Sequence, residues 1–86
     1  QEAGQWHHAL RAARGLSQRE IARLIPVDYY PFISQIESGR GRIPPERYEA
    51  WARALNVDVK DFVRTLMSYY DPITYGILFE HTDRRA

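Results

Sequence analysis

The chain has 86 residues, of which 44% are hydrophobic and 13% aromatic, and its formal net charge is +1. This length fits one domain with a modest core. The absence of cysteine excludes disulfides and thiolate metal sites, and no apolar run is long enough to cross a bilayer. We therefore expect a soluble, cytoplasmic chain without a cofactor, and the start at Gln1 leaves open a further N-terminal domain.

Positive charge is concentrated in the first two thirds of the chain. Eight of the twelve cationic residues lie between Arg11 and Arg53, and eleven of the twelve are arginine. Arginine makes bidentate contacts with phosphate and guanine, although GC-rich coding would produce the same preference. The charge pattern is therefore compatible with a nucleic-acid partner.

The first predicted helix covers residues 5–14, because Trp6, Leu10 and Ala13 recur on one face and Gly15 is a typical terminator. His7 and His8 are adjacent, so on a helix they point about 100° apart and form a poor chelating pair. We expect no metal site.

A second helix begins at Gln18. Ser17 is an N-cap candidate, and Glu20 stands three residues later, which is the capping-box pattern. Pro26 cannot continue a helix and disfavours helical geometry at the preceding residue, so the helix ends there.

A third short helix follows after a tight turn. Asp28 is placed to cap it, Pro31 falls in its first turn, Ile33 and Ile36 share one face, and Gly39 ends it. Two short amphipathic helices separated by such a turn are the layout of a helix-turn-helix.

Two further helices complete the prediction. Pro45 suits the first position of a fourth helix, whose apolar side chains recur with helical spacing at Tyr48, Trp51, Ala52 and Leu55. Asp58 can cap a fifth helix, which the Asp71–Pro72 pair ends, with apolar positions at Val59, Phe62, Val63 and Leu66. Residues 73–79 are apolar and aromatic, and the last six residues are polar enough to fray.

These residues resemble a known family. The pattern of Leu16-Ser17-Gln18 with Ile21-Ala22, of Ile33 to Glu37 with Gly39-Arg40, and of residues 52–57 is similar to the Cro/C1-type (XRE) helix-turn-helix domain. The resemblance implies an all-α, five-helix domain like that of λ repressor at residues 5–66, with an aromatic extension at 67–86. It also implies a bacterial or phage transcriptional regulator that binds double-stranded DNA as a homodimer on an inverted repeat.

The resemblance and the side-chain chemistry together assign roles. Base readout falls to the third helix, where glutamine can pair with adenine and rings can contact thymine methyl groups: Tyr29, Tyr30, Pro31, Ser34 and Gln35. Phosphate contacts fall to its flanks: Ser17, Gln18, Arg19, Arg40 and Arg42. In the family, the acid matching Glu37 pairs with an arginine of the first helix, here Arg11.

The third helix departs from the family pattern in two ways. The segment before it is one residue longer than usual, and Pro26 stands where a turn glycine is commonest. The helix also contains no arginine or lysine. Its aromatic residues Tyr29, Tyr30 and Phe32 therefore allow an alternative, a patch that packs on the second helix or on another protein. Such a chain would be an adaptor or antitoxin-like module that binds a toxin or polymerase. Gln35 has a plainer alternative as a solvated surface residue.

The C-terminal third has more apolar surface than one terminal helix can bury. We expect a two-fold interface that sets the recognition helices one turn of DNA apart, ~34 Å, and the alternative is a cap that folds back on the domain. The expected interface residues are Phe62, Leu66, Tyr69, Tyr70, Tyr75, Ile77 and Phe79. We expect no enzymatic activity, because Glu37 has no acid-base partner in the motif and no nucleophile has a base nearby in the sequence.

Overall fold

The computed structural model describes residues 2–25 and 31–80, and every regular element in these ranges is helical. The elements are α1 (Glu2–Arg14), α2 (Gln18–Leu24), α3 (Pro31–Glu37), the 3₁₀ turn η1 (Pro45–Arg47), α4 (Tyr48–Leu55), α5 (Val59–Tyr70) and α6 (Pro72–Phe79). The predicted all-α class is confirmed.

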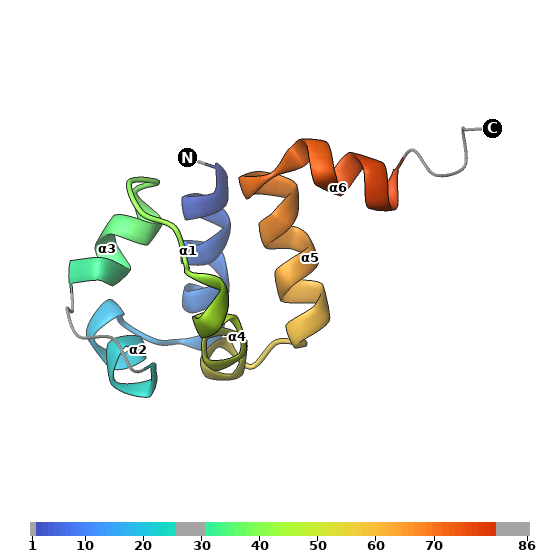
Figure 1. Ribbon diagram of the computed structural model, residues 1–86. Helices are drawn as coiled ribbons and strands as arrows, with labels where there is room; N and C mark the ends of the chain where they lie inside the picture. The colour runs from blue at the N-terminus through green and yellow to red at the C-terminus, as the bar shows by residue number, and fades with distance from the viewer. Residues whose placement is uncertain (1, 26–30, 81–86) are drawn as a thin grey trace.

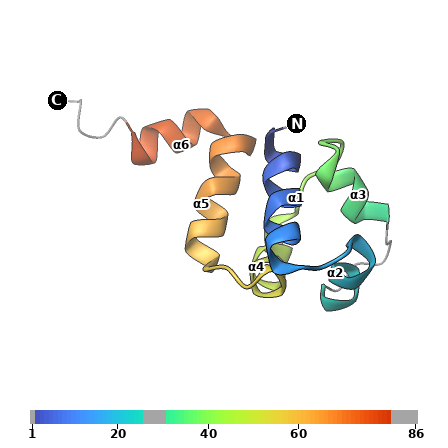
Figure 2. The same ribbon diagram turned by 180° about the vertical axis from the view of Figure 1, so that it is seen from behind.

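Helix α1 stands at the centre of the molecule (Figure 1). Helices α2 and α3 lie to one side of it and α5 to the other, and the reverse view shows the same order (Figure 2). Helix α6 leaves the end of α5 and projects away from α1, which makes the molecule elongated, with extents of 48 × 24 × 23 Å.

The helix ends follow the sequence signals. The Ser17 hydroxyl accepts from the Glu20 amide at 3.0 Å, and the Glu20 carboxylate accepts from the Ser17 amide at 2.8 Å, so the predicted capping box is confirmed. Helix α2 ends before Pro26, and Gly39 has the left-handed φ of 83° after α3. The expected cap of α3, Asp28, lies outside the described residues.

The core forms around Trp51, which is fully buried. The ring of Phe32 meets Trp51 edge-on at 6.0 Å between centroids, and Trp6 stacks on Phe62 at 5.3 Å. Aliphatic side chains of α2, α3, α4, α5 and the connecting segments fill the remaining space, namely Ile21, Ile25, Ile33, Ile36, Ile43, Leu55 and Leu66.

Helix α1 passes unusually close to the end of α3, and Gly4 makes this possible. A Cβ at Gly4 would overlap the carbonyl oxygen of Glu37 and lie 3.0 Å from that of Ile36. The helix begins at Glu2 and not at residue 5 as predicted, because packing against α3 overrides the weak helix propensity of glycine. Ala13, predicted on the packed face, is exposed.

Two further expectations need correction. The turn at Pro45 is a 3₁₀ turn that precedes α4, and residues 72–79 form a sixth helix that was not predicted. Asp71 caps this helix by accepting from the Thr74 amide at 3.2 Å, and Pro72 occupies its first position. Both are recognisable helix-start signals in the sequence.

The expected C-terminal interface is wrong at two positions. Phe62 and Leu66 are 2% and 1% exposed, because α5 turns them toward α1 and α4 to fill the core. They are therefore unavailable to a partner. Tyr69, Tyr70 and Tyr75 are half-buried, whereas Ile77 and Phe79 are exposed.

Candidate nucleic-acid interface

The Glu37 carboxylate at the end of α3 joins three helices. Its Oε2 accepts from Arg11 Nε at 2.6 Å and lies 2.9 Å from His7 Nδ1. Its Oε1 accepts from Arg11 Nη2 at 2.9 Å and from Gln18 Nε2 at 3.0 Å. The Arg11–Glu37 contact is thus bidentate, the strong form of this pair, and it is the pairing that the family resemblance implies.

The environment keeps Glu37 ionised. Its side chain is only 7% exposed, and burial raises the pKa of a carboxyl group. The hydrogen bonds from the surrounding side chains of α1 and α2 outweigh burial and hold the pKa of Glu37 well below its ordinary value of 4.5. The negative charge is therefore a permanent part of the folded domain near neutral pH.

His7 extends this network into the core. The indole nitrogen of Trp51 can only donate, so its 2.6 Å contact makes His7 Nε2 an acceptor. The remaining ring proton of neutral His7 then resides on Nδ1, which donates to Glu37. A chain of polar contacts thus runs from α4 through α1 to α3, with every partner buried or nearly so.

His7 was not predicted as a site residue. Its partners are 30 and 44 residues away in sequence, and two adjacent histidines give no local signal of such contacts.

Arg11 also fixes the turn before α2. Arg11 Nη1 donates to the carbonyl oxygen of Leu16 at 2.8 Å, while Gln18 from the start of α2 reaches Glu37. The same arginine therefore positions the ends of both α2 and α3.

The outer side of α3 carries Ser34, which is exposed, and Gln35, which is half-buried. The Gln35 main-chain carbonyl accepts from the amides of Arg40 and Gly41. The main chain of Gln35, and not its side-chain amide, makes these contacts in the turn after α3. Ser34 and Gln18 line one shallow pocket, which places the start of α2 beside α3.

The remaining base-readout candidates are described in part. Pro31 begins α3, but its side chain lies outside the described residues, as do Tyr29 and Tyr30. Phe32 points inward against Trp51 of α4 and packs on the core, whereas the alternative interpretation placed it against α2 or another protein.

The loop after α3 carries two of the five residues expected to contact phosphate. Arg40 is exposed, and its Nε donates to the Ser38 hydroxyl at 3.2 Å. The guanidinium of Arg42 lies 4.8 Å from the centre of the Tyr70 ring. The Tyr70 hydroxyl in turn accepts from the Ile43 amide at 3.1 Å, which anchors the loop to α5.

A family model described as a helix-turn-helix domain matches residues 8–66, well over half of the chain. The chain belongs to this helix-turn-helix family. No curated protein matches the sequence. The match agrees with the Cro/C1-type resemblance, and membership indicates DNA binding.

Within the helix-turn-helix, α2 is the first helix and α3 the second, which enters the major groove in proteins of this class. The Glu37 network lies behind α3 and ties it to α1, α2 and α4. Buried contacts therefore fix the orientation of the second helix, and Ser34 lies exposed at the edge of this network, where it lines a pocket with Gln18 and Glu37.

The described residues hold no cluster of metal-ligating side chains, and no helix among them is long and apolar enough to cross a membrane.

Proposed function

We propose that the protein is a sequence-specific transcriptional regulator that binds double-stranded DNA as a homodimer on an inverted repeat. Helix α3 enters the major groove, and the protein has no enzymatic role. A DNA partner would place it in the bacterial cytoplasm, with the nucleoid.

The observation that carries this proposal is the asymmetry of α3. Its inner side is tied down by Glu37, Ile33 and Ile36, while Ser34 and Gln35 have no part in that anchoring. A rod that is rigid on one side and polar on the other is what base readout requires, because base contacts demand a fixed geometry.

Base readout in this proposal relies on hydrogen bonds and van der Waals contacts. Gln35 pairs bidentately with adenine, Ser34 bonds to a base edge, and Tyr29, Tyr30 and Pro31 contact bases or thymine methyl groups. No arginine or lysine lies within α3, so we propose a preference for A·T-rich half-sites.

Phosphate contacts come from both sides of α3. Arg19 is exposed on α2, and Arg40 and Arg42 are exposed in the loop. Gln18 uses one amide hydrogen for Glu37 and keeps a second for a phosphate oxygen, so Glu37 pre-orients it. The Ser17 hydroxyl accepts from Glu20 and can still donate outward.

A titration with random-sequence duplex at two salt concentrations tests the proposal against the adaptor alternative. Each neutralised phosphate contributes about −0.9 to the slope of log K against log salt, so three arginines give a slope of about −3 for each copy and about −5 for the dimer. A slope near zero, or no binding at low salt, would favour an adaptor that binds protein.

A further inference from the structure

Helix α6 is apolar on every side and only partly covered. Its sequence PITYGILF contains no charged residue, and within the described chain it packs against α5. Ile73, Ile77 and Leu78 are 76%, 59% and 51% exposed. A helix with this much uncovered apolar surface needs a partner surface.

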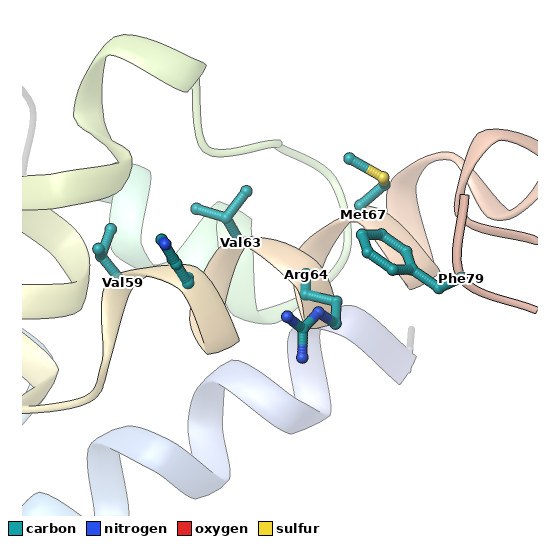
Figure 3. Close-up of a pocket in the computed structure, with 6 residues that line it drawn as sticks. Val59, Val63, Arg64, Met67 and Phe79 are labelled. Carbon is teal, nitrogen blue, oxygen red and sulfur yellow. The ribbon is translucent and has the colours of Figure 1, made fainter.

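The outer side of α5 offers an apolar groove of about 380 Å³ next to α6 (Figure 3). Its floor is formed by Val59, Val63 and Met67, spaced four residues apart on one face of α5, and Phe79 of α6 closes one end. An apolar groove along a helix can receive the apolar side chains of another helix.

Positive charge borders the groove. Lys60 and Arg64 line it beside the apolar floor, and the Arg64 guanidinium lies 5.2 Å from the centre of the Phe79 ring. A helix that carries two apolar side chains followed by an acidic side chain would match both the apolar floor and the positively charged border.

The chain's own α6 has this pattern. Ile73, Ile77 and Glu80 are spaced four and three residues apart, so they share one side of the helix. They span about 10 Å at 1.5 Å per residue, and the floor from Val59 to Met67 spans about 12 Å. Glu80 is exposed at the negative end of α6, opposite in charge to the groove border.

We infer that a second copy of this chain occupies the groove, with α6 of each copy packed on α5 of the other. Ile73 and Ile77 contact the floor formed by Val59, Val63 and Met67. Glu80 faces Lys60 and Arg64 of the other copy. Because groove and helix are adjacent on one molecule, a single two-fold axis forms both contacts at once.

This inference names the interface of the proposed homodimer and rests on the proposed function only for its biological role. Helix α3 and α6 lie on opposite sides of α1 and α5 (Figures 1 and 2). Dimerisation through α6 therefore leaves both recognition helices uncovered.

The first test measures the molar mass of the purified chain between about 1 and 100 µM by light scattering or sedimentation. We expect a dimer, and we expect Ile77→Glu and Val63→Glu each to weaken it at least tenfold. Leu24→Glu is the matched control, since Leu24 is 52% exposed on α2, far from the groove. It should leave the dimer intact. Circular dichroism confirms that each variant is folded.

The second test uses charge reversal. Glu80→Lys alone, or Lys60→Glu with Arg64→Glu, should weaken the dimer about tenfold through like-charge contacts. All three changes in one chain should restore the original dissociation constant. Unfolding cannot explain such a recovery. If each set of changes weakened the dimer by unfolding the chain, combining them would weaken the dimer further.

A wild-type monomer at 100 µM would overturn the inference, as would a dimer that is indifferent to Ile77→Glu and Val63→Glu. Binding of a different protein to a monomeric chain would overturn it as well. The random-duplex titration separates the two proposals. A dimer without DNA affinity contradicts the proposed DNA binding and leaves this interface standing. A monomer with salt-dependent affinity contradicts this interface and the homodimer, and leaves the proposed DNA binding standing.

Discussion

The Glu37 carboxylate receives hydrogen bonds from side chains of both α1 and α2 while its main chain belongs to α3. Glu37→Gln removes the charge and leaves the Arg11 guanidinium, whose side chain is 11% exposed, without its ionic partner. Losing one member of a buried ion pair costs about 3 kcal/mol. Urea denaturation at pH 7 measures this loss, and a change below about 0.5 kcal/mol would contradict the role given to Glu37.

The depressed pKa of Glu37 also predicts a pH dependence. The carboxylate stabilises the folded state fully above its ordinary pKa of 4.5, and this contribution is lost progressively as the pH falls below that value. Between pH 7 and pH 3 the wild-type protein should lose more stability than Glu37→Gln. Equal losses would mean that Glu37 titrates alike in the folded and unfolded states.

Substituting Gln35 and substituting Arg40 should change DNA binding in different ways. Gln35→Ala should relax specificity at one base position, with little effect on random-sequence DNA. Arg40→Ala should weaken binding to every sequence and reduce the salt slope by about 1. Binding curves on selected and random duplexes distinguish them, and identical behaviour of the two variants would show that the assignment of roles is wrong.

At the residue scale, a contact could be predicted from the sequence where a local motif or the family resemblance specifies it. The Ser17–Glu20 capping box is local, and the Arg11–Glu37 pairing followed from the family resemblance. The His7–Trp51 hydrogen bond joins residues 44 positions apart and depends on how α1 lies on α4. No local pattern contains that information.

At the scale of elements, several helix ends were predicted from a cap or a proline. The starts at Gln18 and Val59 and the end before Pro26 follow these signals. The early start of α1 did not follow one, because it depends on contact with α3. Helix α6 was missed although Asp71 and Pro72 mark its start, since its apolar residues lack the one-sided pattern of an amphipathic helix.

The close contact between α1 and α3 predicts that replacing a helical glycine by alanine destabilises this protein, which is the reverse of the usual effect. Alanine ordinarily stabilises a helix relative to glycine by up to about 1 kcal/mol. Gly4→Ala should instead destabilise this domain by about 1–3 kcal/mol, because the new methyl group meets the Glu37 carbonyl oxygen and α1 must shift. Thermal unfolding measures the effect, with exposed Gln5→Ala as the control. A stabilised Gly4→Ala variant would contradict the close packing of the two helices.

At the scale of the whole molecule, composition could not divide apolar residues between core and surface. Phe62 and Leu66 carry the same chemical signal as Ile73 and Ile77, yet the first pair is buried and the second exposed. The direction in which each helix leaves its neighbour decides this, and in α6 that direction is away from the domain.

The placement of α6 predicts the spacing of half-sites. Helix α3 packs on α1, α1 on α5 and α5 on α6, and neighbouring helix axes lie about 8–10 Å apart. Two copies joined through α6 therefore hold their α3 helices at most roughly 50 Å apart when these distances are added in line, which is nearer to the ~34 Å of one DNA turn than to the ~68 Å of two.

Two turns is the next spacing that presents both half-sites on one face of the duplex. Duplexes carrying two selected half-sites centred about 10 or about 21 base pairs apart should differ, with tighter binding at the shorter spacing. Tighter binding at the longer spacing would place the dimer axis elsewhere on the domain.

The central claim is that the outer side of α3 and its flanks form the DNA-binding surface. Amide chemical-shift mapping by NMR during titration with a random-sequence duplex tests it most directly, because it needs no known operator. We expect perturbations at residues 17–19, 34–35 and 40–42, with residues 73–79 unaffected. Perturbations confined to α6, or none on α3 at saturating duplex, would contradict it.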